Sequence, residues 1–230
     1  MNKTHKHKSA RGQTRKGKKM CSFLFFLLVT CYLLPVTITH SADVNDIVER
    51  IQKKYAEIHD IHGMFYQTSY LKDLDRMEKY SGEFHIKKPS RLRWQYGAPR
   101  DEEVLISGDE IWIYKKSEKQ VLKSRFSKEA YSQVPIAMLE SLKDLETDYE
   151  IKMTADEVLE LVPRKRMGVI NRLILITGPG DFPITSFTIF DIYGNSNVIE
   201  LKELKINPGL EDSFFIFKMP AGAELFDYSR

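Results

Sequence analysis

The spacing of apolar residues changes from a helical period to a strand period near Gly63. Before that point, segment 43–61 places apolar side chains on one side of a helix, at Val44, Ile47, Val48, Ile51, Tyr55 and Ile58. This spacing predicts an amphipathic helix. After Gly63, apolar and polar residues alternate instead. In segment 91–96 the alternation puts Leu92 and Trp94 on one face of a predicted strand.

Alternating runs of this kind recur through the rest of the chain, separated by Gly, Pro or Asp. They predict about ten or eleven strands in an antiparallel sheet that curves or closes, with the last strand over 213–220. A second helical segment is predicted over 127–145, interrupted by Pro135. Strands and helices do not alternate as in βαβ units, so we predict an α+β fold with helices against one side of the sheet.

Residues 1–41 differ from the rest of the chain and are typical of a secretory signal peptide. Residues 1–20 hold eight Lys or Arg and no acid, and an apolar run and then small residues follow. The apolar run is short compared with the roughly 20 residues of a membrane span. We predict cleavage near Ser41 or Ala42, a start at Met1 or Met20, and one exported domain over 42–230. An uncleaved anchor and lipid attachment at Cys31 are the alternatives.

Removing this leader changes the charge and leaves no cysteine. The whole chain has 35 Lys and Arg against 32 Asp and Glu, but all of the acids and only 27 of the cations lie after residue 41. The predicted domain therefore has a net charge of −5, which disfavours nucleic-acid binding through phosphate neutralisation. Both cysteines, Cys21 and Cys31, lie in the leader. The domain therefore has no disulfide, thiolate nucleophile or cysteine-ligated metal.

The sequence contains no recognisable set of nucleophile, base and orienting residue. His59 and His62 have the spacing H-x-x-H at the end of the first predicted helix, but two histidines do not complete a metal site. The H-E-x-x-H and G-x-S-x-G motifs are absent. The acids at 101–103 follow Arg100 after a turn and are typical of solvated charges. We predict a protein without enzymatic activity, metal or cofactor.

Large apolar side chains are abundant on the predicted strands and on the predicted helices. The stretch 82–99 is predicted to form two strands around a Lys-Lys-Pro-Ser turn, with Phe84, Ile86, Leu92 and Trp94 on the apolar face. Two interpretations remain open. One is a fully packed core, and the other is an apolar cavity beneath the helices of an incompletely closed barrel.

Five short motifs along the chain resemble those of one known family. They occur in order: MFYQ at 64–67, IKKPSRLRW at 86–94, VLISGDEIWIY at 104–114, VPIAMLESL at 134–142 and FFIFKMPAGAEL at 214–225. Together they resemble the periplasmic outer-membrane lipoprotein carriers of the LolA type, over essentially the whole exported domain. The resemblance implies an unclosed antiparallel β-barrel of about eleven strands, with helices forming a lid over an apolar cavity.

The resemblance also implies a function. The protein would accept a lipoprotein from an inner-membrane ABC transporter complex, shield its acyl chains, and deliver it to an outer-membrane acceptor lipoprotein. It would act in the periplasm as a monomer, with no covalent step. A lipid-sensing envelope regulatory protein and a lipid-anchored outer-membrane acceptor of the same fold are alternatives. An exported hydrolase is an alternative from another class.

The resemblance assigns roles to a few residues. The lid latch, a basic residue before the proline of the IKKPSRLRW motif, falls on Lys88, where many members have Arg; Lys lacks the planar guanidinium fork. Contacts between the lid and the barrel fall on Tyr55, Leu139 and Phe187. The predicted cavity lining is Phe84, Ile86, Leu92, Trp94 and Phe187.

Overall fold

The computed structural model describes residues 43–127 and 141–229. The chain begins there with helix α1 (Val44–Glu57), as the apolar spacing predicts. The helix buries one face, made of Ile47, Val48, Ile51 and Tyr55. The Asp46 carboxylate accepts a hydrogen bond from the Asp43 backbone N–H at 3.4 Å, which satisfies one free donor at the start of the helix.

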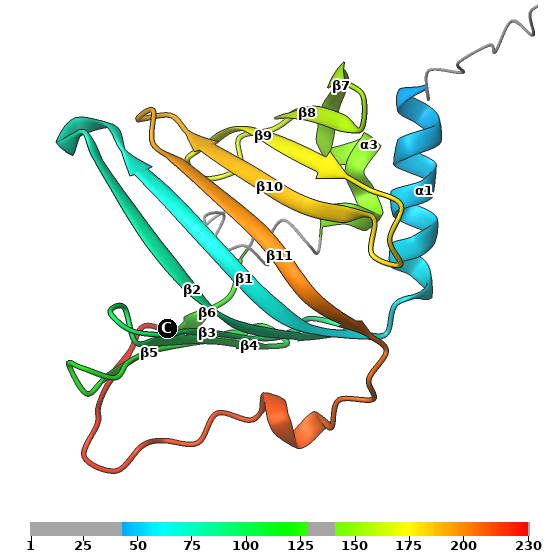
Figure 1. Cartoon of the computed structure of the whole chain (residues 1–230). Coiled ribbons are helices and arrows are strands. Elements are labelled where there is room, and N and C mark those ends of the chain that lie inside the picture. Colours follow the sequence, from blue (N-terminus) through cyan, green and yellow to red (C-terminus); the bar gives the residue numbers. More distant parts are fainter. Residues whose placement is uncertain (1–42, 128–140, 230) are drawn as a thin grey trace, which may run out of the picture. The chain divides into compact units, whose positions relative to one another are not determined.

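A twelve-stranded sheet makes up most of the described chain (Figure 1). Its strands are β1 (Asp60–Leu71), β2 (Arg76–Lys87), β3 (Arg91–Tyr96), β4 (Glu102–Ser107), β5 (Glu110–Lys115), β6 (Gln120–Arg125), β7 (Tyr149–Ala155), β8 (Val158–Pro163), β9 (Ile170–Thr177), β10 (Ile184–Asp191), β11 (Ser196–Ile206) and β12 (Glu224–Asp227). The short helical elements are η1 (Lys72–Leu74), η2 (Ser141–Asp144), α3 (Leu145–Asp148) and η3 (Asp212–Phe215).

The sheet is open, and its spatial order is β12-β6-β5-β4-β3-β2-β1-β11-β10-β9-β8-β7. All neighbouring strands are antiparallel except β12 and β6, which are parallel. Among the described residues the terminal strands β12 and β7 do not pair with each other. The predicted α+β fold with an unclosed, mainly antiparallel sheet is therefore confirmed, with twelve strands rather than about eleven and with one parallel pair.

The hairpin of β1 and β2 lies at the centre of the sheet. The two strands pair over their full length, from Asp60 opposite Lys87 to Leu71 opposite Arg76. Strand β3 then pairs with β2 across a turn at 88–90, which confirms the predicted pair of strands around the Lys-Lys-Pro-Ser turn. Gly82 is needed in this pairing, because a Cβ atom there would lie 1.9 Å from the Gln95 carbonyl oxygen.

One face of the sheet is apolar and packs against α1; we call it the inner face, and the opposite one the outer face. The register places Phe84 opposite Trp94 and Trp94 opposite Val104 on the inner face. In the other half of the sheet, Leu175, Phe187 and Ile199 are aligned in the same way. All of these residues belong to one buried cluster that also includes the apolar side of α1. The cluster thus spans both halves of the sheet.

The C-terminal segment differs from the prediction. Residues 213–220 were predicted as a strand, but Asp212–Phe215 form the 3-10 helix η3, and the last strand is β12. The apolar pattern arises because this segment lies over the outer face, where Phe214 packs against His85 and Phe217 stacks on Trp112. Figure 1 shows the segment in orange and red, passing beneath β3, β4 and β5. A chain laid across the face of a sheet finds no backbone partner there.

The second predicted helical segment, 127–145, lies mostly outside the described residues, as does Leu139. Its last residues form η2, and α3 follows directly. Leu142 and Leu145 are buried in the same apolar cluster as α1. Residues 1–41 also lie outside the described residues, so the leader and its cleavage site stay predictions. No helix of the described chain is both long enough and apolar enough to cross a bilayer.

Candidate functional site

The inner face gathers all five residues that were predicted to line a cavity. Phe84, Ile86, Leu92, Trp94 and Phe187 are each at most 5% exposed and belong to the same cluster. The Trp94 ring packs against two phenylalanines, with centroid distances of 4.1 Å to Phe65 and 5.3 Å to Phe84. In this state the five side chains are covered, so they become available to a ligand only if part of their cover moves.

Helix α1 contributes its apolar side to the same buried cluster. Ile47, Val48, Ile51 and Tyr55 turn inward and are at most 7% exposed. The helix also contacts η2 and β7, and Figure 1 shows it beside α3. An amphipathic helix on an apolar sheet face buries the same kind of surface that an acyl chain would bury. Helix and acyl chain can therefore compete for the inner face.

Lys88 holds the C-terminal end of α1. Its Nζ donates a hydrogen bond to the Tyr55 carbonyl oxygen and lies 4.1 Å from the centroid of the Tyr55 ring. Its backbone N–H donates to the His59 carbonyl oxygen at 2.9 Å. Burial lowers the pKa of Lys88, because the charged form loses water. The structure thus brings together two of the three predicted lid residues, Tyr55 and Lys88, and their role as a latch stays a prediction.

Asn207 is a second tether at the same helix end, and the sequence did not point to it. Its Oδ1 accepts hydrogen bonds from the backbone N–H groups of His59, at 2.7 Å, and Asp60, at 3.3 Å. Its Nδ2 donates to the Glu57 carbonyl oxygen at 3.2 Å. Asn207 stands before Pro and Gly, which is an ordinary turn signal. Only the pairing of β1 with β11 brings it to the helix.

Arg50 attaches the middle of α1 to the other half of the sheet. Its guanidinium pairs with the Glu157 carboxylate and donates to Thr177 Oγ1 at 3.2 Å. Glu157 lies between β7 and β8, and Thr177 ends β9. The hydrogen bonds from Arg50 and Thr177 lower the pKa of Glu157. The helix is thus joined by polar contacts to both halves of the sheet, and its apolar side is part of the cluster that spans them.

A small polar group interrupts the apolar inner face on β1, β3 and β11. The Tyr96 hydroxyl donates to Gln67 Oε1 at 3.0 Å, and Gln67 Nε2 donates to Ser69 Oγ at 2.9 Å and to Asn197 Oδ1 at 3.2 Å. Burial raises the pKa of Tyr96 to about 12, so its hydroxyl stays neutral and can act as a donor. These paired polar groups mark one limit of the apolar surface.

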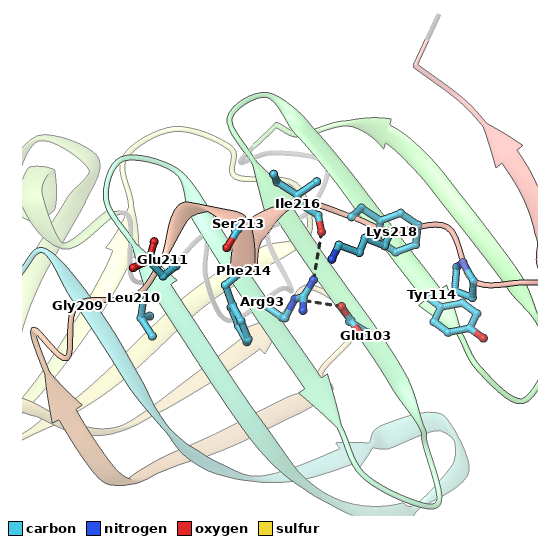
Figure 2. Close-up of a pocket in the computed structure, with 12 residues that line it drawn as sticks. Arg93, Glu103, Tyr114, Gly209, Leu210, Glu211, Ser213, Phe214, Ile216 and Lys218 are labelled. Atoms are coloured by element: carbon cyan, nitrogen blue, oxygen red, sulfur yellow. Dashed lines mark hydrogen bonds and ion pairs between the residues drawn. The ribbon is translucent and has the colours of Figure 1, made fainter.

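Two hollows lie near this arrangement. One, of about 350 Å³, adjoins the apolar cluster and is lined in part by three cluster members, Phe182, Ile184 and Leu201. The other, of about 680 Å³, lies on the outer face between β3–β5 and the C-terminal segment. Figure 2 shows Arg93 in the outer hollow between Phe214 and Glu103, and its ion pair with Glu103 spans 3.2 Å. The outer hollow is lined by charged as well as apolar groups.

Comparison with known proteins decides the family. The family model described as "Outer membrane lipoprotein carrier protein LolA" matches residues 56–218. The chain belongs to the LolA family. This match covers the sheet from β1 to β11, the latch position Lys88 and the tether Asn207, and it confirms the resemblance seen in the sequence motifs.

Two LolA-family relatives are both named outer-membrane lipoprotein carrier protein. The protein of Halorhodospira halophila is 25% identical over 87% of this chain and 93% of its own length. That of Nitrosospira multiformis is 27% identical over 91% and 97%. Among solved structures, an uncharacterized conserved protein from Thermus thermophilus has a TM-score of 0.50 at 13% identity, over 80% of this chain and 98% of its own, which is a likeness of fold alone.

Proposed function

We propose that this LolA-family protein carries lipoproteins through the periplasm, with their acyl chains held on the inner face in place of α1. One observation carries the proposal: a continuous apolar sheet face that is covered by an amphipathic helix anchored through a few polar side chains. The names of the relatives support the same role. The role needs no covalent chemistry and no cofactor.

The energetics of an acyl chain explain why such a surface is useful. Each CH₂ group taken out of water contributes about 0.8 kcal/mol, so one long acyl chain represents on the order of 10 kcal/mol. A carrier has to recover most of this free energy and still release its cargo. If α1 competes with the acyl chain for the inner face, closure of the helix favours release and opening favours loading.

The hollow beside the cluster offers a first place for an acyl chain. Three of its lining residues, Phe182, Ile184 and Leu201, already belong to the apolar cluster, so a chain entering there would extend directly onto the inner face. Further insertion would displace the apolar side of α1. Phe84, Ile86, Leu92, Trp94 and Phe187 would then contact the lipid.

The proposed pathway has a donor and an acceptor. The lipoprotein would come from an ABC transporter complex of the inner membrane and pass to an acceptor lipoprotein of the outer membrane, with this protein acting as a monomer. The net negative charge predicted for the domain disfavours polyanionic partners such as nucleic acid.

Depletion of the protein in its native host tests the proposal. Fractionation should then show lipoproteins of the outer membrane retained in the inner membrane, and re-expression should restore their sorting. Normal sorting after depletion would refute carriage and favour the lipid-sensing alternative. Mass spectrometry of the mature N-terminus separates carrier from anchored acceptor: a start at Ala42 or Asp43 is expected, and a diacylated Cys31 would contradict it.

A further inference from the structure

Two histidines and a glutamate meet on the outer face of the central hairpin. His62 of β1 stands directly opposite His85 of β2, and their ring centroids are 4.2 Å apart. Glu83 lies two residues before His85 and therefore on the same face of β2. One ligand atom from each of the three side chains lies within 4.8 Å of the other two. Two imidazole nitrogens and a carboxylate oxygen this close together make the group a candidate cation-binding site.

His85 is the fixed member of this group. It is 6% exposed, and its ring packs against Phe214 of the C-terminal segment at a centroid distance of 4.5 Å. Its Nδ1 is buried and has no hydrogen-bond partner. A buried imidazole nitrogen without a partner is uncommon, and an ion or a water molecule is the usual explanation. His62 is half-buried and Glu83 is exposed, so both can adjust toward an ion.

We propose that His62, Glu83 and His85 bind one Zn²⁺ ion, with water in the remaining coordination position. Zn²⁺ prefers imidazole nitrogen and carboxylate oxygen at about 2.0–2.2 Å in a tetrahedron, which places the ligand atoms about 3.3 Å apart. Rotation of the His62 and Glu83 side chains would bring the ligand atoms from their present spacing, within 4.8 Å, to this one. Two nitrogens and one oxygen suit Zn²⁺ better than Mg²⁺ or Ca²⁺, which prefer oxygen ligands.

The site differs from the one suggested by the sequence and from the proposed cargo surface. The sequence pairs His59 with His62, whereas the sheet pairs His62 with His85. The outer face lies opposite the apolar inner face, so a bound ion leaves the acyl-chain surface free. By joining β1 to β2, the ion would stabilise the central hairpin through binding to the folded state alone.

The test is a Zn²⁺ titration against a chromophoric chelator, using protein purified from the envelope of an expressing bacterium. We expect the parent to bind one more equivalent of Zn²⁺ than His62→Ala does. We expect Glu83→Gln and His85→Ala to weaken Zn²⁺ binding at this site by at least about tenfold. His59→Ala is the matched control and should bind like the parent. Zinc held elsewhere in the protein would be common to the parent and all of these variants.

Two further measurements keep the outcome decisive if His85→Ala does not fold. In the parent, Zn²⁺ should shift the imidazole NMR signals of His62 and His85 and leave that of His59 in place. It should also raise the Tm of the parent and not that of His62→Ala. The same number of zinc equivalents in His62→Ala as in the parent, the loss of one equivalent in His59→Ala, or imidazole signals unmoved by stoichiometric Zn²⁺ would each overturn the proposal.

Discussion

Replacing Lys88 by methionine tests whether the contact with Tyr55 holds the helix closed. Methionine keeps an unbranched apolar stem and removes the ammonium group, which donates to the Tyr55 carbonyl oxygen and lies over the Tyr55 ring. The tether through Asn207 remains. The substitution should therefore weaken the closed state without removing the helix from the fold.

The size of the effect follows from the two contacts. A hydrogen bond from a charged donor contributes about 1.5–3 kcal/mol, and a cation–π contact at an accessible site about 0.5–1 kcal/mol. Lys88 is half-buried, so solvent reduces both contributions, and methionine avoids the cost of dehydrating the ammonium. We expect a net change of about 1.5 kcal/mol, or roughly tenfold in the ratio of open to closed protein.

Binding of a fluorescent long-chain acyl probe and hydrogen exchange in α1 measure this change. If the free protein is mainly closed, Lys88→Met should bind the probe up to about tenfold more tightly, because the competent fraction has grown. It should also release lipoprotein more slowly, and the amides near Tyr55 should exchange about tenfold faster.

Lys87→Met is the matched control. Lys87 pairs with Asp212 and donates to the Leu210 carbonyl oxygen, so its contacts lie with the C-terminal segment rather than with α1. This variant should leave the probe affinity and exchange in α1 unchanged. If Lys88→Met behaves like the wild type, or if both variants change the probe affinity equally, Lys88 does not hold the helix closed.

Three further substitutions follow from the same contacts. Asn207→Ala removes the second tether and should speed exchange at the end of α1 by a factor corresponding to about 1 kcal/mol; unchanged exchange would exclude a tethering role. Phe187→Ala truncates a fully buried side chain and should lower the free energy of unfolding in urea by about 3–5 kcal/mol, whereas a loss below about 1 kcal/mol would mean that the site is loosely packed. Glu157→Gln should cost less than about 1 kcal/mol, because its ion pair with Arg50 is about one-third exposed. The lowered pKa of Glu157 means that the wild type keeps this contribution above the ordinary pKa of 4.5 and loses it as the pH falls, so stability curves of wild type and variant should converge in acid; parallel curves would contradict the pairing.

The elements that the sequence predicted correctly are those with a strong local pattern. The apolar spacing of Ile47, Ile51 and Tyr55 identifies one face of α1 without knowledge of the sheet. Likewise, the alternation around Leu92 and Trp94 sets the faces of β3, and a proline after Lys88 marks the turn. In each case, neighbours in sequence are enough to decide the local structure.

The C-terminal segment shows where a local pattern misleads. Its run of apolar, aromatic-rich residues is typical of a strand, yet Phe215 is buried and Phe217 stacks on Trp112 because the segment lies over the outer face. Apolar residues indicate that a segment packs against something and do not indicate that its backbone pairs with a strand. The strand that does form, β12, follows at Glu224 and pairs in parallel with β6.

Contacts between distant residues could not be predicted from one sequence. Asn207 lies about 150 positions from the helix end that it tethers, and the meeting of His62 with His85 depends on the register of β1 with β2. A one-residue shift in that register would place these side chains on opposite faces. The family resemblance identified Lys88. It did not identify the tethers at Asn207 and Arg50 or the pair of His62 and His85.

Site-specific photo-crosslinking tests most directly whether acyl chains occupy the inner face. A photoreactive phenylalanine analogue would replace Phe187 on the inner face and, as the control, Tyr114, which lines the hollow on the outer face. Each variant would be loaded with an acylated lipoprotein and irradiated, and the attached fragment would be identified by mass spectrometry. If acyl chains occupy the inner face, an acyl adduct is expected at position 187 and none at 114. Equal labelling at the two positions, or labelling at 114 alone, would contradict that occupancy.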